Sequence, residues 1–364
     1  MHRPASLRCM PSVLVAMSGG VDSSVSACLL AEQGYEVVGS HMKLVHLDGV
    51  DHGCCGPLAE ADAREVARIG GFGFEVVDMS ETFSRTVLAD FFAEHENGRT
   101  PNPCARCNER IKFGAFLDRA GRRGIDFVAT GHYVRTSCTD GGWRLLRGRD
   151  RDKDQSYMLH TLGQRELGRS LFPVGGMTKT ETRAHAQRFG LPVAGKPDSQ
   201  EVCFVPGADH ASFLAEHAPH LAREGEIVDS TGIVRGTHPG TFRFTIGQRR
   251  GHGVSTGERS YVVDVQPDAN RVVIGPKDLL ARRGLEADRV TWVAGAPPSD
   301  GPFEAEVRIR YRGRDAAAVV EPLDGDRARV EFRTPQPAVA SGQSVVVYRG
   351  DELLGGGRIV ESIR

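Results

Sequence analysis

The sequence predicts three domains: an α/β domain with a doubly wound, mainly parallel sheet, then a small β-rich central domain, and then a C-terminal β-barrel. Two observations support this fold class. The first half of the chain alternates short apolar runs with stretches of helical spacing, whereas from about residue 225 short alternating strands follow one another between turn signals. With 364 residues, the chain also exceeds what one hydrophobic core usually organises. The predicted domain limits are 1–207, 208–282 and 283–364.

The N-terminal elements predict a βαβ unit. Residues 12–17 (SVLVAM) are a short apolar run, residues 22–34 have apolar positions at helical spacing, and residues 35–42 (YEVVGSHM) are a second apolar run. Parallel strands joined by a helix imply a right-handed crossover. The alternation continues with strands at 74–79 and 126–133 and with helices at 59–71, at 81–95 and after Cys107. Four strands in this pattern predict the doubly wound sheet.

The last helix of this domain has a signal at each end. Thr178 and Glu181 stand in capping-box register, and Gly190 precedes Pro192 where the helix is expected to stop. Further on, residues 225–236 and 261–275 alternate apolar and polar positions, the second range as a hairpin with a polar turn. A Pro/Gly-rich linker at 293–302 then precedes the strands of the predicted barrel.

The composition excludes several classes of protein. The formal net charge is −1, so any nucleic-acid site must be a local basic patch. No apolar run approaches the roughly 20 residues that span a bilayer, and the opening MHRPASLRCM lacks the apolar region of a secretory signal. We therefore expect a cytoplasmic protein without membrane contact. Eight cysteines are too sparse for a disulfide scaffold, so we expect them to serve catalysis, metal binding or packing.

A glycine-rich loop, SGGVDSS (residues 18–24), lies between the first strand and the first helix. Glycines let backbone N–H groups approach an anion, and a helix N-terminus adds partial positive charge. The loop has neither the lysine of a Walker loop nor the G-x-G-x-x-G of a dinucleotide fold. An ordinary capped turn is the alternative, but the loop stands where ligands bind in open α/β sheets, so we predict a phosphate site.

Three cysteines stand in contexts that suggest chemistry. Cys104 and Cys107 lie in PNPCARCN, a rigid turn leading into a helix, where a helix dipole favours thiolate, and Cys203 lies in a short apolar run beyond the last helix. A zinc site would need His132 or His210 as fourth ligand and lacks the usual second CxxC pair. An iron–sulfur cluster held by the three cysteines, with one open iron position, stays open as an alternative.

An ordered set of motifs resembles the tRNA-specific 2-thiouridylase family, within the PP-loop ATP pyrophosphatase superfamily, across nearly the whole chain. The motifs are MSGGVDSS, HMK, TPNPCARCNERIKF, ATGHY, KDQSYML, KPDSQEVCFV, FTIGQRRG and RYRG. The resemblance implies a PP-loop domain, a central domain and a C-terminal β-barrel. It also implies that ATP, with Mg²⁺, adenylates an oxygen of the substrate. Nucleotide-binding residues carried over by the resemblance are Ala16, Met17, Ser18, Gly19, Gly20, Val21, Asp22, Ser23, Met42 and Gly131.

By the same resemblance, Cys203 receives a persulfide sulfur from a sulfur-relay donor, a cysteine desulfurase or relay protein. Cys107 matches the catalytic cysteine and would end in a disulfide with Cys203. The implied target is the wobble uridine of tRNAs for lysine, glutamate and glutamine, whose C2 oxygen is replaced by sulfur. Cys104 departs from the pattern, because many relatives carry aspartate there. That change puts the acid/base role of the position in doubt and supplies the third thiol of a [4Fe-4S] alternative.

Contacts to tRNA are expected from several segments. In VRIRYRGR, Arg308, Arg310 and Arg312 recur at period two, which predicts one basic face of a strand that binds phosphates. Asn102 is a further candidate because an amide can read the edge of a flipped-out uridine. The resemblance assigns tRNA contacts to Lys153, Asp154, Gln155, His132, Tyr311, Arg312 and Gln343.

Two other classes of function compete with a sulfurtransferase. A PP-loop ligase with a nitrogen nucleophile would have no use for Cys107 and Cys203. An RNA-binding β module with a vestigial nucleotide site would bind tRNA without converting ATP to AMP, and it leaves the complete SGGVDSS unexplained. We expect a monomeric sulfurtransferase.

Overall fold

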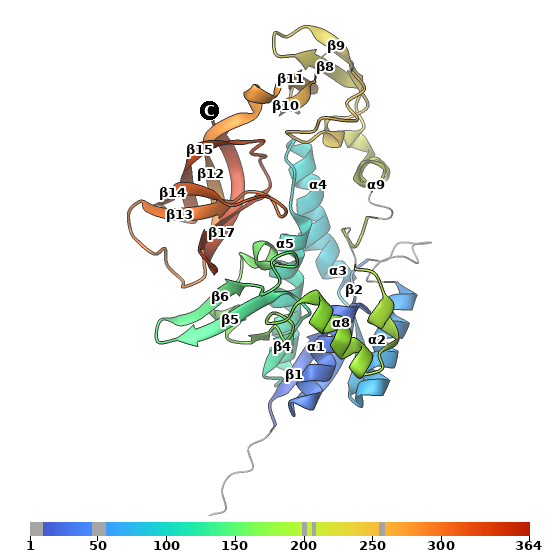
Figure 1. Ribbon diagram of the computed structural model, residues 1–364. Helices are drawn as coiled ribbons and strands as arrows, with labels where there is room; N and C mark the ends of the chain where they lie inside the picture. The colour runs from blue at the N-terminus through green and yellow to red at the C-terminus, as the bar shows by residue number, and fades with distance from the viewer. Residues whose placement is uncertain (1–9, 46–55, 199–201, 206–208, 255–258) are drawn as a thin grey trace, which may run out of the picture.

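The computed structural model describes residues 10–45, 56–198, 202–205, 209–254 and 259–364 (Figure 1). Within these ranges the N-terminal domain contains a five-stranded sheet of order β3-β2-β1-β4-β7, and every neighbouring pair is parallel. The predicted doubly wound sheet is confirmed. Its strands are β1 (Ser12–Ala16), β2 (Glu36–Lys43), β3 (Gly73–Asp78), β4 (Phe127–Ala129) and β7 (Ser170–Leu171).

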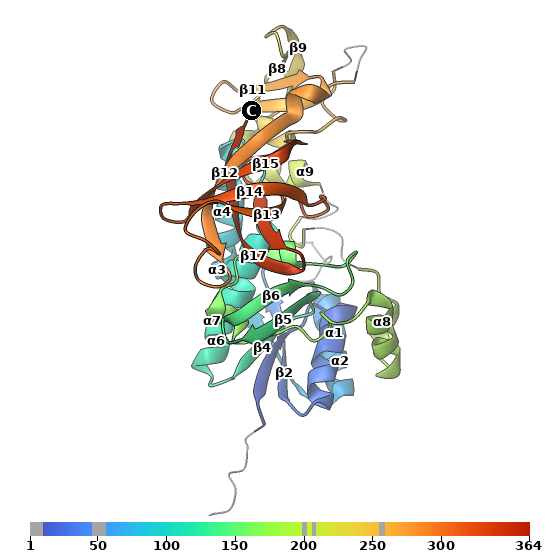
Figure 2. The ribbon, with the colours of Figure 1, turned by 60° about the vertical axis from the view of Figure 1, so that its left-hand side comes forward.

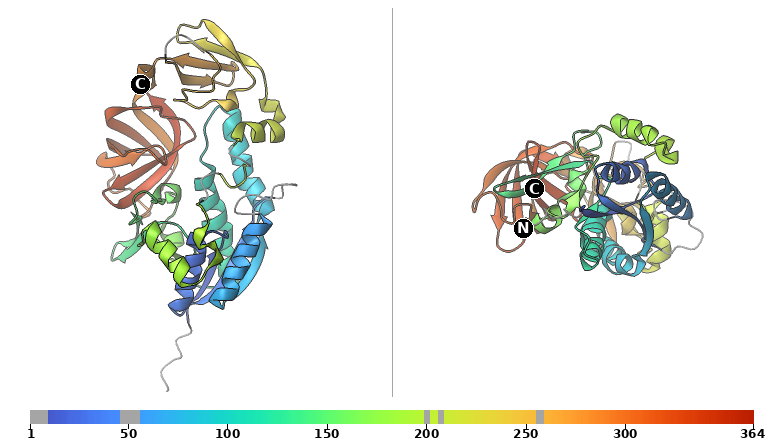
Figure 3. Two further views of the ribbon diagram at one scale, coloured as in Figure 1. Left: turned by 45° about the vertical axis from the view of Figure 1, so that its right-hand side comes forward. Right: turned by 90° about the horizontal axis from the view of Figure 1, so that it is seen from below.

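Helices cover both faces of this sheet, and the alternation of side chains along β1 explains why. Val13 and Val15 pack in one apolar core with residues of α1, α2 and α8, whereas Leu14 and Ala16 pack in another with the helices that follow β3 and precede β4. Figure 3 shows these helices on opposite sides of the strands when the molecule is seen from below. Helices of the first group are α1 (Val21–Glu32), α2 (Pro57–Gly70) and α8 (Lys179–Arg188), followed by the 3-10 turn η4 (Pro192–Gly195).

Two long helical stretches form the second group, and each contains π-helical turns. The first comprises α3 (Ser80–Phe83), η1 (Ser84–Leu88) and α4 (Ala89–Glu96). The second comprises α5 (Pro103–Cys107), η2 (Asn108–Ala115) and α6 (Phe116–Arg122). The second stretch begins at Pro103 and not after Cys107 as the sequence predicts, because Asn102 caps the helix and Pro103 occupies its first position. Cys104 and Cys107 therefore lie inside the helix.

The central domain is a small β structure, as predicted. Its described strands have the order β10-β11-β8-β9, and the predicted hairpin is β10 with β11. The strands are β8 (Gly225–Asp229), β9 (Val234–His238), β10 (Tyr261–Gln266) and β11 (Arg271–Gly275), with α9 (His210–His217) and the turns η6 (Pro219–Leu221), η7 (Thr241–Arg243) and η8 (Lys277–Leu280). Helix α4 extends from the N-terminal domain toward this domain (Figure 1).

The C-terminal domain is a closed antiparallel barrel in which β12 pairs with both β15 and β17. Its strands are β12 (Ala281–Trp292), β13 (Phe303–Arg308), β14 (Ala316–Leu323), β15 (Arg327–Pro337), β16 (Ser344–Arg349) and β17 (Glu352–Ile363). The prediction of one strand face bearing Arg308, Arg310 and Arg312 is wrong. Strand β13 ends at Arg308, and a turn carries the next two arginines.

The N-terminal half also contributes to the barrel sheet, which the sequence did not predict. A hairpin of β5 (Val134–Thr139) and β6 (Gly142–Arg147) pairs with β17 through Leu145 and Leu146 (Figure 2). After the hairpin come η3 (Ser156–Leu159) and α7 (Gln164–Leu167). Because this hairpin belongs to the N-terminal domain by position and to the barrel by hydrogen bonding, the three domain limits stay a prediction.

Candidate active site

The phosphate loop connects β1 to α1 at the carboxyl edge of the sheet. The sheet order changes direction there, because β2 lies on one side of β1 and β4 on the other. Gly19 has φ +67°, and a Cβ at this position would lie 2.3 Å from the carbonyl oxygen of Ala59 in α2. Only glycine fits there without strain. Gly20 caps α1 in an extended conformation, so the first N–H groups of the helix open onto the loop.

Serine hydroxyls organise the loop from within. The backbone N–H of Ser18 donates to Ser23 Oγ at 3.2 Å, and the Ser23 hydroxyl donates to the carbonyl of Gly20 at 3.2 Å. Ser24 Oγ donates to the same carbonyl at 2.8 Å, and Ser24 is fully buried. Ser18 is thus exposed on the loop, whereas Ser23 and Ser24 are buried and hold it.

Other predicted nucleotide residues surround the same edge. Gly131 follows β4, and a Cβ there would lie 2.6 Å from the backbone nitrogen of Ser23. Ala16, Met17 and Met42 are buried at the ends of β1 and β2. The structure therefore brings together the loop and the segments after β2 and β4, which the sequence places far apart.

Asp22, at the start of α1, has partners that the sequence did not reveal. Its two carboxylate oxygens accept hydrogen bonds from Lys179 Nζ at 2.7 and 2.9 Å, and Oδ1 also accepts one from the hydroxyl of Tyr133 at 2.8 Å. Lys179 begins α8. Burial first, and then the Asp22 carboxylate, raise the pKa of Tyr133 above its ordinary value, so Tyr133 stays a donor.

A second carboxylate joins these cations to the segment that leads to Cys203. Asp198 lies 2.8 Å from Lys153 Nζ, 2.7 Å from Lys179 Nζ and 3.2 Å from Arg183 Nη2. Burial alone would raise the pKa of Asp198, but hydrogen bonds from Lys153 and Lys179 outweigh burial and lower it. With Asp22, two carboxylates face three cations, which leaves positive charge beside the phosphate loop.

At the start of α1, a magnesium ion would find the carboxylate of Asp22. Mg²⁺ in nucleotide sites is commonly held by one or two carboxylates together with substrate phosphates, so the residues fit an ion that arrives with ATP. Because Lys179 bonds both oxygens of Asp22, such an ion would share or displace that lysine.

The cysteine pair lies at the start of the second long helical stretch. The Asn102 side chain accepts a hydrogen bond from the backbone N–H of Ala105 at 3.2 Å and so caps the helix. Cys104 is half-buried and Cys107 is 7% exposed. Tyr311, a residue of the barrel, lies near Cys104. Burial first, then Asp154, and to a smaller extent the Cys104 thiol raise the pKa of Tyr311.

Cys203 is held through its neighbour Phe204. The Phe204 ring is 2% exposed and packs edge-on against Phe83, Phe91 and Phe213 at centroid distances of 5.4 to 5.6 Å. Cys107 belongs to the same apolar core, and Cys203 packs against it. Residues 203 and 204 form a turn and residue 205 a bend, so this part of the short apolar run is not a strand.

The cysteines do not form a metal site in the described ranges, which include Cys104, Cys107 and Cys203. No group of three or more His, Cys, Asp or Glu side chains in those ranges is placed to hold a metal ion.

Most predicted tRNA contacts have structural partners. Asp154 is 5% exposed and accepts hydrogen bonds from Gly148 N and from both Ser156 N and Oγ, at 2.9 to 3.1 Å. Its carboxylate also lies 3.6 Å from each of Arg147 and Arg308. Asp154 thus joins the β5–β6 hairpin to the barrel instead of facing solvent.

Gln155 and His132 are likewise engaged inside the protein. Gln155 Oε1 accepts from the N–H of Tyr133 at 2.9 Å, and His132 Nδ1 lies 2.7 Å from Thr130 Oγ1. Burial holds the pKa of His132 well below its usual range, so the ring is neutral. Of the predicted contacts, Arg312 is exposed, and Lys153 and Tyr311 are partly exposed.

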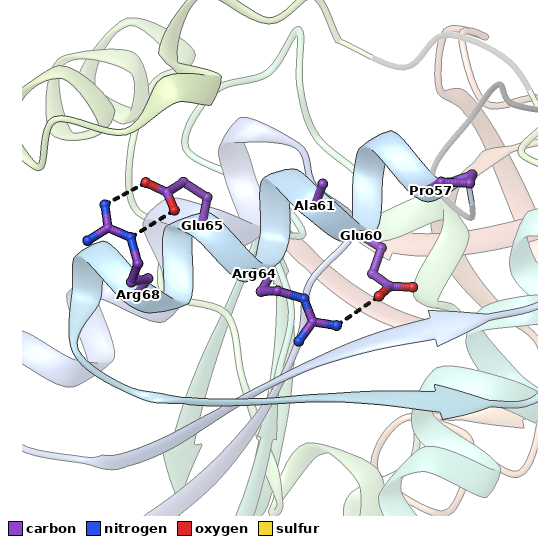
Figure 4. A pocket seen from close by; sticks show the side chains of 6 residues that line it. All are labelled: Pro57, Glu60, Ala61, Arg64, Glu65 and Arg68. Carbon is purple, nitrogen blue, oxygen red and sulfur yellow. Dashed lines mark hydrogen bonds and ion pairs between the residues drawn. The ribbon is translucent and has the colours of Figure 1, made fainter.

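A groove on the described surface lies elsewhere, on the outer face of α2. Its volume is about 450 Å³, and Figure 4 shows its charged side chains paired with one another, Arg64 with Glu60 and Arg68 with Glu65. It contains none of the predicted site residues.

Fold and site together define a nucleotide-binding α/β enzyme of the HUP class joined to two β domains. Three family models match in order: "tRNA methyl transferase HUP domain" over residues 11–207, "tRNA methyl transferase PRC-barrel domain" over 211–276 and "Aminomethyltransferase beta-barrel domain" over 282–359. The chain belongs to the tRNA-specific 2-thiouridylase family, as the full-length relatives below establish.

Curated proteins named tRNA-specific 2-thiouridylase match nearly end to end. The protein of Geobacter metallireducens is 48% identical over 355 residues, covering 95% of this chain and 96% of that one. The protein of Acidothermus cellulolyticus is 47% identical over 361 residues, covering 97% and 98%. A solved 4-thiouridine synthetase–RNA complex with bound ATP is more distant, at 16% identity and a TM-score of 0.36 over 57% of this chain and 49% of that one.

In the described residues no helix has both the length and the apolar character needed to cross a membrane.

Proposed function

We propose that the protein is an ATP-dependent tRNA sulfurtransferase that makes 2-thiouridine at the wobble position of tRNAs for lysine, glutamate and glutamine, with AMP and pyrophosphate as products. One observation carries the proposal: a complete SGGVDSS loop stands at the switch point of a parallel sheet, in a chain that matches 2-thiouridylases over 95% of its length. Cytoplasmic localisation and a monomeric state belong to the same proposal.

The first step activates the base. The uridine C2 oxygen attacks the α-phosphorus of ATP, and the bond from that phosphorus to the bridging oxygen of pyrophosphate breaks. Backbone N–H groups at Gly19 and Gly20 and the Ser18 and Ser23 hydroxyls would receive the pyrophosphate. The excess of cations at Lys153, Lys179 and Arg183 over nearby carboxylates stabilises the charge that accumulates on the leaving group.

The second step moves sulfur. A donor, a cysteine desulfurase or relay protein, loads Cys203 as a persulfide. The Cys107 thiolate attacks the inner sulfur, so a Cys107–Cys203 disulfide forms and hydrosulfide leaves. Hydrosulfide adds to C2 and expels AMP, and a dithiol reductant then restores both thiols. Asn102, His132, Lys153, Asp154, Gln155, Tyr311 and Arg312 are the proposed tRNA-facing set, with Asp154, Gln155 and His132 acting from beneath the surface. The family resemblance also implies a tRNA contact for Gln343, and this role competes with a structural role of the same side chain.

A thiolation assay with two sulfur sources tests this scheme. Cys107→Ala and Cys203→Ala should both lose activity with a persulfide donor and retain it with added sulfide, because in this scheme both thiols act only in the release of sulfide. Cys138→Ala, at an exposed position of β5, is the matched control and should behave as wild type. Full activity of Cys203→Ala with the persulfide donor would contradict the proposed relay.

Iron analysis tests the alternative cluster. We expect anaerobically purified protein to thiolate tRNA without bound iron, and Cys104→Ala and Cys104→Asp to leave iron content unchanged at background. Activity that rises with iron and acid-labile sulfide, and falls in Cys104→Ala, would favour the cluster.

If neither sulfur source yields thiolated tRNA while ATP is converted to AMP on addition of an amine, the result would favour the alternative function, a PP-loop ligase with a nitrogen nucleophile.

A further inference from the structure

The C-terminal barrel is in direct contact with the turn that precedes the cysteine pair. We propose that Gln343 and Ser344, in the barrel, are positioning residues that hold this turn and thereby place Cys104 and Cys107. The inference rests on the proposed function in one respect, the use of Cys107 as the reacting thiol. It assigns Gln343 a role different from the tRNA contact implied by the family resemblance.

Two short segments make the contact: the TPN turn (residues 100–102) and the SGQS turn (residues 341–344). The N–H of Thr100 donates to the carbonyl of Ser341 at 2.8 Å. Gln343 Nε2 donates to the carbonyls of Thr100 and Pro101 at 2.9 and 3.2 Å. Because a primary amide nitrogen has two hydrogens, these bonds use both of them.

The backbones approach so closely that a side chain would not fit between them. Gly342 has φ +89°, and a Cβ there would lie 2.9 Å from both N and O of Thr100. Contacts under 3.0 Å require the neighbour to shift, and here the neighbour is backbone. The SGQS turn is therefore shaped to receive the TPN turn.

Asn102 links this contact to the helix that carries the thiols. Its Oδ1 caps the helix at Ala105 N, while its Nδ2 donates to Ser344 Oγ at 3.1 Å. Ser344 is 4% exposed and is itself fixed, since its hydroxyl lies 3.0 Å from His160 Nε2 and its carbonyl accepts from the Tyr157 hydroxyl at 2.8 Å. The amide of Asn102 thus binds the cysteine helix with one end and the barrel with the other.

The SGQS turn is also fixed within the barrel. Gly342 N donates to the carbonyl of Ile359 in β17, and Ile359 N donates to the carbonyl of Gln343, both at 2.8 Å. A second link runs in parallel, because Asp90 accepts from Arg106 at 2.8 Å and from barrel residue Arg289 at 3.0 Å. Arg106 stands between the two cysteines, so the cysteine helix is attached to the barrel on two sides.

The experiment compares Gln343→Glu with Gln336→Glu. In Gln343→Glu a carboxylate oxygen replaces the amide nitrogen that donates to the carbonyls of Thr100 and Pro101. Both hydrogen bonds are then lost, so the TPN turn should be released from the barrel. The matched control makes the same change on the same barrel, where Gln336 Nε2 bonds only the local carbonyl of Thr334. Readouts are the thiolation rate, the dissociation constants for ATP and for the tRNA, and the alkylation rate of each cysteine.

Alkylation can be read separately for the two thiols, because trypsin cleaves after Arg99, Arg106 and Arg110 and gives the peptides TPNPCAR and CNER. For Gln343→Glu we expect alkylation of Cys104 and Cys107 about tenfold faster, from the loss of two hydrogen bonds, and thiolation slowed about 10- to 100-fold by misplacement of the thiol. Affinities for ATP and tRNA should stay within twofold of wild type, and Gln336→Glu should match wild type throughout.

Ser344→Ala and Ser344→Thr provide a second, milder pair. Alanine removes the acceptor for Asn102, whereas threonine keeps a hydroxyl, so threonine should restore slow alkylation of Cys104 where alanine does not. The proposal is overturned if Gln343→Glu weakens tRNA binding while alkylation of both thiols stays at the wild-type rate, because Gln343 would then be a tRNA contact only. An inactive wild type, or a Cys107→Ala variant that is active with the persulfide donor, would instead refute the proposed function. The alkylation rates would then still test the contact between the TPN and SGQS turns.

Discussion

Single residues decide the geometry of the phosphate loop. At Gly19 two independent requirements coincide, a positive φ and the absence of a Cβ against the backbone of Ala59. The sequence predicted this loop correctly in kind, because glycine and serine between a strand and a helix indicate an anion site whatever their partners. It did not reveal Lys179 or Asp198, which are placed beside Asp22 only by the fold.

Gly19→Ala should both destabilise the protein and abolish ATP binding. The added methyl group meets backbone at 2.3 Å and the residue keeps a left-handed φ, so we expect a loss of about 2 to 4 kcal/mol in unfolding free energy. Gly34→Ala is the control, because Gly34 has φ +87° but nothing within 4 Å of its Cβ position, and it should cost only about 1 kcal/mol. Urea unfolding and ATP titration measure both effects; equal losses for the two variants would contradict the steric argument.

Lys179→Met should weaken ATP binding. Lys179 neutralises Asp22 and Asp198 together, and without it two carboxylates repel the phosphates at the loop. We expect the dissociation constant for ATP to rise at least about tenfold, the scale of one charge-assisted contact. Lys277→Met, an exposed position in η8, should leave ATP affinity unchanged. An unchanged affinity in Lys179→Met would mean that the lysine serves the fold alone.

Whole elements were predicted well where the hydrophobic period was clear and poorly where a strand ended within a charged run. Strands β1 to β4 and helix α8 follow from period and capping, and the Thr178–Glu181 capping box is present. The run from Arg308 to Arg312 has the period of a strand, but β13 ends inside it, where the Arg308 guanidinium turns back to Asp315 at 2.7 Å. Alternation alone cannot locate such an end, because the ion pair that fixes it involves a residue outside the run.

The KDQ segment (residues 153–155) and the RYRG turn (residues 310–313) should respond differently to mutation. Asp154→Ala leaves Arg147 and Arg308 without their buried carboxylate, so we expect a loss of about 3 kcal/mol or more in unfolding free energy. Arg312→Ala, at an exposed position, should leave stability unchanged, weaken tRNA binding and lower the salt slope by about 1. Denaturant unfolding and tRNA binding at several salt concentrations separate the two. Equal stability of both variants would place Asp154 with the tRNA contacts.

Across the whole molecule, two buried histidines and the half-buried His95 predict how stability depends on pH. Burial is the first cause that lowers the pKa of His160 and of His95, each to about 4, and it lowers that of His132 further. The unfolded chain therefore binds more protons than the folded chain between about pH 6.5 and pH 4, and stability falls as pH falls through this window.

Urea unfolding at pH 7, 6 and 5 and constant ionic strength should show this decline, amounting to a few kcal/mol in total. His160→Gln removes one of the titrating rings and should flatten it. A free energy of unfolding that is constant from pH 7 to pH 5 would contradict the assignment of neutral buried rings.

The pairing of β6 with β17 also has a consequence for biosynthesis. A ribosome releases the β5–β6 hairpin about two hundred residues before the strand that will pair with its edge. Until then, the nascent chain presents an unpaired strand edge next to Asp154 and Arg147. The second cation that pairs with Asp154, Arg308, has not yet been synthesised at that stage. Translation that stalls before residue 352 should therefore leave a species that aggregates or recruits chaperones, even though the parallel sheet and the phosphate loop are already complete.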